Sequence, residues 1–108
     1  MEIQVEISNL KFLSDLMETP SEIKTGSQVN IPGGATLTLN QITGYKAFDM
    51  GKVIEFALNF GSGVSASLIA SWLYQKFNGN VTNIRINRRE IHFNKGEIEK
   101  IITEEIEL

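Results

Sequence analysis

The sequence predicts an α+β domain, in which helices cover one face of a small mixed or antiparallel sheet of about four strands. Residues 2–8 and 81–94 alternate apolar and polar side chains, which is the period of strands with one buried face. Residues 94–107 instead repeat isoleucine at helical spacing. Residues 49–78 carry the main apolar stretch, and we interpret them as a central αα-hairpin.

Composition narrows the class of protein. The 108 residues fit a single domain, residues 1–108, with a modest core. A formal net charge of −3 disfavours binding to nucleic acid. The absence of cysteine excludes disulfides, thiolate zinc sites and cysteine nucleophiles, and a single histidine argues against a histidine-rich metal site. The first residues lack the basic start and apolar core of a signal peptide, so we expect a cytoplasmic protein.

The first half of the central stretch has one narrow polar stripe. Lys52, Glu55 and Asn59 recur three and four residues apart, and apolar side chains occupy most of the other positions. Asp49 stands where an N-cap belongs, and Gly61 fits the position just after a helix end. We therefore predict a mostly buried helix between Asp49 and Gly61.

The second half of the stretch restarts at Ser62, which can serve as an N-cap. Its large apolar side chains share one face: Val64, Leu68, Ile69, Trp72 and Leu73. Small residues such as Ala66 and Ala70 would let another backbone approach this helix closely. Asn78-Gly79-Asn80 then ends it. The spacing predicts a helix over residues 63–77 that packs on two sides.

The N-terminal part predicts a strand followed by a short helix. Ile3, Val5 and Ile7 share one face, and Asn9 can cap a helix that Pro20 ends. Residues 21–34 carry no clear pattern, although residues 29–31 have the composition of a short strand. Pro32-Gly33-Gly34 predicts a turn before a strand over residues 35–42. The context of a phosphate-binding loop is absent there, because a strand follows the turn rather than a helix.

The C-terminal part predicts a hairpin of strands and a last helix. Ile84 and Ile86 face one side, and a turn near Asn87-Arg88-Arg89 brings Ile91 and Phe93 to the same side. Asn94 can cap the last helix, with Glu97 placed as in a capping box. The inner face of that helix is predicted to carry its isoleucines: Ile98, Ile101, Ile102 and Ile106.

Outward-facing polar side chains should lie on the uncovered face of the sheet: Glu2, Gln4, Glu6, Asn83, Arg85, Glu90 and His92. His92 with Glu90 and Glu6 would suit a metal or acid–base site. The same residues are also what a solvated strand face displays, and we favour that interpretation. We therefore predict no catalytic, cofactor-binding or metal-binding residues and no cofactor.

Arg85, Arg88 and Arg89 cluster at the tip of the predicted hairpin of strands. Their guanidinium groups could contact a phosphate or an acidic partner. A solvated turn is the simpler interpretation, since surface charges usually serve solubility. We retain all three arginines as candidate contacts to a partner.

Several short motifs run along most of the chain. They are a strand and helix at the start (MEIQVEISNLKFLSDLM), the pair Met50-Gly51, the break Gly61-Ser62-Gly63, and a small-residue helix ending in Trp72-Leu73. In these the chain resembles the effector-associated constant component family of bacterial conflict systems. It departs from that family in residues 21–45 and in Tyr74-Gln75-Lys76, where an arginine run is usual. The resemblance implies a non-enzymatic partner of effector proteins and carries over no catalytic residue.

The sequence thus favours a non-enzymatic protein-interaction module, a component of a bacterial or phage conflict or defence system. One alternative is a small membrane-acting protein, such as a pore former or holin, because no charge interrupts residues 56–75. Polar residues and a helix stop within that stretch argue against a membrane span. A third alternative is a small enzyme that uses His92 with Glu6 or Glu90.

The same stretch predicts an assembly surface. One helical layer would leave a side of residues 63–77 uncovered, and that side carries Ala66, Ala70 and Tyr74. We predict that these residues contact an effector protein or a second copy of the chain. For a second copy, a two-fold homodimer is the simplest arrangement. We expect neither nucleic acid nor a membrane as a partner.

Overall fold

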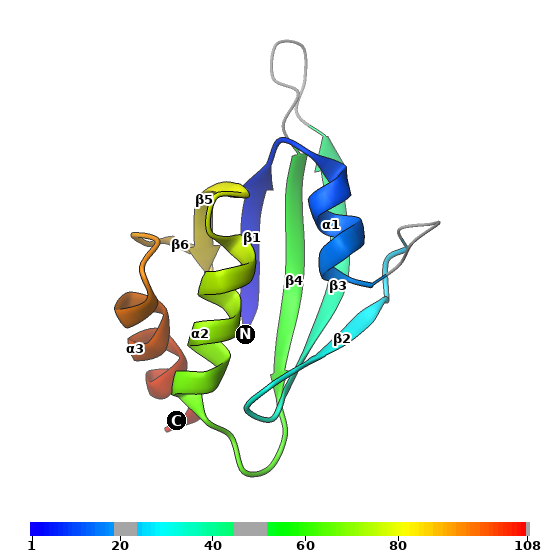
Figure 1. The fold of residues 1–108 in the computed structure, drawn as a ribbon. Coiled ribbons are helices and arrows are strands. Elements are labelled where there is room, and N and C mark those ends of the chain that lie inside the picture. The colour runs from blue at the N-terminus through cyan, green and yellow to red at the C-terminus, as the bar shows by residue number, and fades with distance from the viewer. Residues whose placement is uncertain (19–23, 45–51, 108) are drawn as a thin grey trace.

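The computed structural model of the protein describes residues 1–18, 24–44 and 52–107. Within them the chain forms six strands and three helices (Figure 1). In chain order these are β1 (Glu2–Ile7), α1 (Leu10–Leu16), β2 (Gln28–Ile31), β3 (Ala35–Gly44), β4 (Lys52–Phe60), α2 (Ala66–Phe77), β5 (Val81–Ile86), β6 (Arg89–Glu90) and α3 (Lys95–Ile106).

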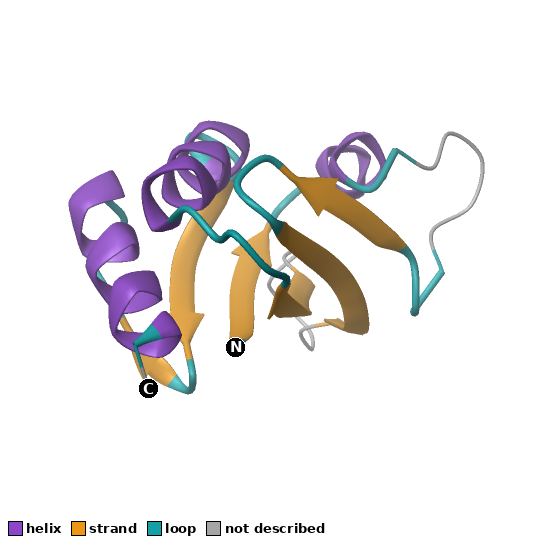
Figure 2. Ribbon diagram, turned by 90° about the horizontal axis from the view of Figure 1, so that it is seen from below, coloured by secondary structure: helices purple, strands orange, loops and turns teal. Residues whose placement is uncertain are grey.

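The described strands form one antiparallel sheet in the order β2-β3-β4-β1-β5-β6. Figure 2 shows that all the helices of the described residues lie on one side of this sheet. The predicted α+β class and the one-sided helical cover are therefore confirmed, with six strands rather than about four. Elements β1, α1, β3, β4, α2 and β5 follow the β-α-β-β-α-β order of ferredoxin-like domains, to which β2, β6 and α3 are added.

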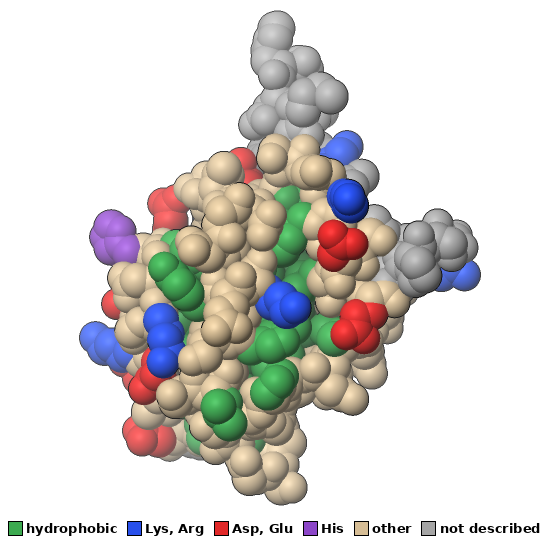
Figure 3. All heavy atoms as spheres, in the orientation of Figure 1, with side chains coloured by type: hydrophobic (Ala, Val, Ile, Leu, Met, Phe, Trp, Pro, Cys, Tyr) green, Lys and Arg blue, Asp and Glu red, His purple; other side chains and the backbone are tan. Residues whose placement is uncertain are grey.

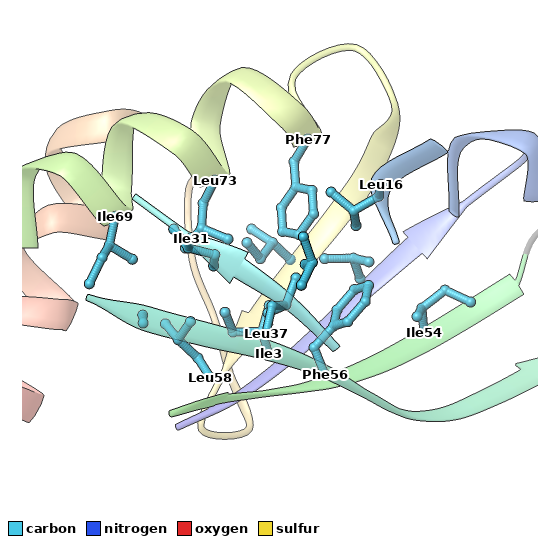
Figure 4. Packing of buried hydrophobic residues seen from close by; sticks show 14 of the residues in the cluster. Ile3, Leu16, Ile31, Leu37, Ile54, Phe56, Leu58, Ile69, Leu73 and Phe77 are labelled. Atoms are coloured by element: carbon cyan, nitrogen blue, oxygen red, sulfur yellow. The ribbon is translucent and has the colours of Figure 1, made fainter. Parts of the chain in front are cut away.

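The core lies between the sheet and the helices. Alternate residues of each long strand are buried, as Ile3, Val5 and Ile7 show on β1. From α2, Ile69, Leu73 and Phe77 point at this apolar face of the sheet (Figure 4). The Phe77 ring stacks on Phe56 of β4, with 6.0 Å between ring centroids. One apolar layer therefore holds the helices on the sheet.

The predicted αα-hairpin of residues 49–78 is wrong in its first half. Residues 52–60 form strand β4, which lies between β3 and β1. Ile54, Phe56 and Leu58 are buried, whereas the intervening Glu55 and Ala57 are only half-buried. Buried and less buried residues thus alternate along this segment, as in a strand. The segment is short enough that its polar residues also fit one face of a helix. Asp49, Met50 and Gly51 lie outside the described residues.

The second half of that stretch is a helix, but it starts later than predicted. α2 begins at Ala66, and its N-cap is Ser65 instead of Ser62. The Ser65 hydroxyl accepts a hydrogen bond from the Leu68 N–H at 3.3 Å. Asn78 ends the helix as expected. Residues 61–64 form the loop that carries the chain from β4 up to α2.

The Pro32-Gly33-Gly34 turn joins β2 to β3 and packs against the start of α2. The Gly33 carbonyl accepts from the Ser65 N–H at 2.8 Å, and the Gly34 carbonyl accepts from the Gly61 N–H at 2.7 Å. Gly33 has a φ of +106°, and a Cβ atom there would lie 3.0 Å from the Ile69 and Leu68 side chains. Glycine is therefore required by backbone conformation and by close approach.

The C-terminal hairpin and helix follow the prediction in outline. Asn87 and Arg88 have φ values of 50° and 69°, so they form the tight turn between β5 and β6. β6 ends at Glu90, and Ile91 and Phe93 are half-buried outside any strand. Asn94 caps α3 by accepting from the Glu97 N–H at 2.7 Å. Ile98 and Ile102 are buried as predicted, whereas Ile106 is 37% exposed.

Candidate functional site

A row of polar side chains crosses the uncovered face of the sheet. Side chains of directly opposite residues on neighbouring strands point to the same face. Gln4 on β1 lies between Glu55 on β4 and Arg85 on β5, and Arg85 lies opposite Glu90 on β6. This row carries two carboxylates, one amide and one guanidinium group on four adjacent strands.

A second row runs beside the first. Glu6 on β1 lies between Val53 on β4 and Asn83 on β5. The Asn83 amide donates a hydrogen bond of 2.6 Å to the Glu6 carboxylate. A hydrogen bond to a charged acceptor fixes that carboxylate on the face of the sheet. Glu6 therefore occupies a defined position beside the first row.

The two rows enclose a shallow hollow of about 100 Å³. Its lining residues come from four strands: Gln4, Val5, Glu6, Val53, Asn83, Arg85 and Glu90. Pockets that bind drug-sized molecules measure about 300–1,000 Å³. This hollow therefore has room for the end of one side chain of a partner, rather than for a whole ligand.

Negative charge predominates on the described part of this face. Glu2, Glu6, Glu55 and Glu90 lie on it, and Arg85 is the basic residue in their midst. A surface with this excess of carboxylates attracts cationic groups and repels a phosphate backbone. The electrostatics of the site thus favour a basic partner.

A second, larger hollow opens at the edge of the sheet. β6 pairs only with Arg85 and Ile86, and the Ile91 N–H then donates to the Ile84 carbonyl at 3.2 Å. Beyond that bond the chain leaves β5 toward α3. The hollow left there has a volume of about 530 Å³ and is lined by Thr82, Asn83, Ile84, Glu90, Ile91, His92, Phe93 and Glu97. We call it the edge notch.

The edge notch adjoins the hollow on the uncovered face. Asn83 and Glu90 line both, so the two form one continuous surface around the β5 edge. Carboxylates stand at both ends of it, Glu6 on the face and Glu97 at the start of α3. We take this continuous surface as the candidate functional site.

Of the three residues proposed for an acid–base or metal site, Glu90 lines a hollow with each of the other two, whereas His92 and Glu6 share none. His92 is exposed and lines the edge notch with Glu90, whereas Glu6 lines the other hollow. Among the residues that the structure describes, no three His, Cys, Asp or Glu side chains are grouped as around a metal ion.

The predicted contacts on α2 lie in different environments. Ala70 is fully buried, so a partner could contact it only if the chain rearranged. Tyr74 is half-buried and stacks on Phe93, with ring centroids 5.1 Å apart. Ala66 is half-buried at the start of the helix. α3 and the segment before it therefore cover much of the side of α2 that was expected to be free.

The arginines of the hairpin also divide. Arg85 lies within the first row on the uncovered face, and Arg88 is in the tight turn. Arg89 lines another hollow, between the hairpin and α3, with Glu104 and Glu105. Only Arg85 thus belongs to the candidate site.

Two surface features escaped the sequence interpretation. Leu68 on α2 is 54% exposed, beside the half-buried Trp72, whose ring lies 5.9 Å from the Lys76 ammonium nitrogen. Figure 3 shows hydrophobic side chains gathered at the surface beside α2. Glu55 and Val53 on the uncovered face were also missed, because their segment was taken for a helix. Their alternation with Ile54 and Phe56 was the available signal.

Compared with known proteins, the chain matches no family model, no curated protein and no solved structure. Within the described residues, no helix is both long and apolar enough to cross a membrane. The uncharged residues 56–75 are divided between strand β4, a loop and the 12-residue helix α2.

Proposed function

We propose that this domain is a non-enzymatic protein-interaction module whose uncovered sheet face binds a basic surface of another protein. The observation that carries the proposal is the continuous acidic surface formed by the two rows and the edge notch. It is built on paired strands, which hold Glu6, Glu55 and Glu90 in fixed relative positions. A rigid charged surface favours rapid and selective encounter with a complementary one.

A different protein suits this face better than a second copy. In an isologous contact the same patch meets itself around a two-fold axis. Two copies of this face would bring the carboxylates of Glu6, Glu55 and Glu90 against each other. Like charges placed together across an interface are costly. The proposal therefore specifies a heterologous, basic partner.

We further propose that the partner is an effector of a bacterial or phage conflict system. The support is the sequence resemblance. Of the segments that carry it, the first forms strand β1 and helix α1, and the one with Trp72-Leu73 forms helix α2. A strand, β4, stands where the resemblance implies an apolar helix. The binding proposal consequently rests on the site, and the resemblance adds only the kind of partner.

The test compares two charge reversals of equal size. One variant combines Glu6→Lys with Glu90→Lys on the candidate site. The control combines Glu104→Lys, at an exposed position of α3, with Glu107→Lys at its exposed C-cap. Tagged wild type and both variants are used to capture proteins from the native cells, with folding checked by circular dichroism.

We expect the wild type and the α3 variant to recover the same basic protein in stoichiometric amount, and the site variant to lose it. The captured protein is then purified and titrated against all three forms. Loss of binding in the α3 variant alone, or equal binding by all three, would contradict the proposal.

A further inference from the structure

We infer that two copies of the domain pair through the outer edge of strand β2, around a two-fold axis at Val29, so that their sheets join into one. β2 lies at the end of the sheet opposite to β6, so this edge is separate from the candidate site. The inference does not depend on the basic partner of the proposed function. Sheet edges join protein chains through backbone hydrogen bonds.

The hydrogen bonds of the sheet show which backbone groups of β2 point outward. In an antiparallel pair, residues that bond the neighbouring strand alternate with residues that face away from it. The Leu39 N–H donates to the Ser27 carbonyl at 2.9 Å, so every second residue from Ser27 onward bonds β3. The N–H and C=O groups of Gln28 and Asn30 therefore point away from β3. Both residues are exposed.

A second bond gives the same assignment from the other side of β3. The Leu58 N–H of β4 donates to the Met1 carbonyl at 2.7 Å, so Leu58 bonds toward β1 and not toward β3. Its neighbour on β3, Leu37, therefore bonds toward β2, where it lies opposite Val29. Among the residues that the structure describes, no hydrogen bond reaches the outward backbone groups of β2.

The spacing of these outward groups fixes the register of a symmetric pair. Antiparallel strands related by a two-fold axis at Val29 place Gln28 of one copy opposite Asn30 of the other. Residues opposite each other in this way exchange an N–H···O bond in both directions. The pairing thus satisfies all the outward groups of Gln28 and Asn30 at once. The contact is isologous and closes on itself, because each copy uses the same edge.

The charge of this edge suits contact between two identical surfaces. No charged residue occurs in residues 25–45, so like charges do not oppose the pairing of two copies. Across the join, the amide side chains of Gln28 and Asn30 would be neighbours on the uncovered face of the sheet. By contrast, β6 at the other end of the sheet carries Arg89 and Glu90. Charged side chains commonly protect a sheet edge from pairing, and β2 lacks them.

Exposed apolar surface lies beside the C-terminal end of β2. The turn that follows β2 packs against α2, where a Cβ atom on Gly33 would lie 3.0 Å from the Leu68 side chain. Leu68 is 54% exposed, among the hydrophobic side chains that Figure 3 shows beside α2. The two-fold axis places the N-terminal end of the second copy's β2 next to this end. A second copy in this register therefore approaches apolar surface that is otherwise left in water.

Both ends of β2 limit the length of the pairing. The Gly26 N–H donates to the Leu39 carbonyl at 2.7 Å, and the Leu39 N–H donates to the Ser27 carbonyl, so a bulge precedes the strand. Pro32 follows the strand and has no N–H to donate. Bulges and prolines restrict strand addition along an edge. The edge therefore favours one short pairing between two copies rather than open-ended growth.

The register gives a test with two matched double variants. One variant combines Gln28→Lys with Asn30→Lys, which places lysine opposite lysine in the paired copies. The other combines Gln28→Lys with Asn30→Glu, which places lysine opposite glutamate. Both change the same exposed positions, and circular dichroism checks the folding of both. Sedimentation from micromolar to millimolar concentration gives the dimerisation constant of each variant and of the wild type.

We expect the wild type to dimerise, the lysine–lysine variant to dimerise about tenfold more weakly, and the lysine–glutamate variant to dimerise at least as tightly as the wild type. Like charges directly opposite on neighbouring strands are destabilising, whereas opposite charges are favourable. A wild type that stays monomeric at every concentration would overturn the inference. Equal dimerisation by the two variants, whether retained or lost, would also overturn it.

Hydrogen exchange checks the same edge residue by residue. The amides of Val29 and Ile31 bond β3 and should exchange slowly at any protein concentration. The amides of Gln28 and Asn30 point outward and should become protected only as the dimer forms. A dimer that leaves these two amides unprotected would form through another surface, and the inference would fail.

Discussion

The two faces of the sheet come from the same strands and have opposite properties. On β1, Ile3, Val5 and Ile7 lie under the helices, and Glu2, Gln4 and Glu6 alternate with them on the other side. The helical side buries its side chains in one core, whereas the uncovered side keeps polar groups in register across four strands. Alternation therefore assigns stability to one face and leaves the other free for recognition.

This division predicts that neighbouring substitutions on one strand differ greatly in effect. Phe56 is fully buried and stacks on Phe77, so Phe56→Ala should lower the free energy of unfolding by about 3–5 kcal/mol. Glu55 is adjacent but faces the other side, and Glu55→Ala should change it by no more than about 0.5 kcal/mol. Urea unfolding of the two variants measures both values. Similar losses would show that the faces are not divided in this way.

Ala70 sharpens the comparison, because the sequence had placed it on a partner surface. It is fully buried against the core, so Ala70→Arg should introduce an unpaired buried charge and cost several kcal/mol, on the order of 3–5. Ser67→Arg, at an exposed position of the same helix, is the control and should be nearly neutral. Thermal unfolding followed by sedimentation distinguishes the outcomes. A stable Ala70→Arg protein with altered association would restore the predicted interface.

The glycines of two turns provide a smaller test of the helical side. Gly33 and Gly26 both have positive φ, so alanine should cost each about 1–2 kcal/mol in backbone strain. Only Gly33 also has Ile69 and Leu68 atoms 3.0 Å from an added Cβ, which should add about 1–3 kcal/mol. Denaturant midpoints of Gly33→Ala and Gly26→Ala give the difference. Equal losses would mean that the turn does not press on α2.

The sequence predicted well those elements in which only one period fits. β1 alternates along its whole length and β5 alternates from Asn83 to Ile86, and Asn9 and Asn94 cap the helices expected of them. The helix predicted over residues 52–60 was wrong because the segment fits two patterns. Lys52, Glu55 and Asn59 have helical spacing, but Glu55, Ala57 and Asn59 also alternate with buried residues, as in a strand. Placement between two strands decided the outcome, and that is a tertiary effect.

The candidate site could be predicted in part. Gln4, Glu6, Asn83, Arg85 and Glu90 were all assigned to the uncovered face, and they line its hollow. What the sequence did not contain was strand order, which brings Glu55 of β4 beside Gln4 and places β6 at an edge. The edge notch depends on the residue at which β6 ends and the chain turns away from β5. No local sequence pattern predicts that residue.

The proposed function places recognition on the uncovered face and the β5 edge, and not on the helical face. Hydrogen exchange of the domain, alone and bound to the protein that it captures, tests this most directly. We predict slower exchange in residues 2–6 and 81–91 on binding, with residues 66–76 of α2 unchanged. Protection confined to α2, around the exposed Leu68, would contradict the account.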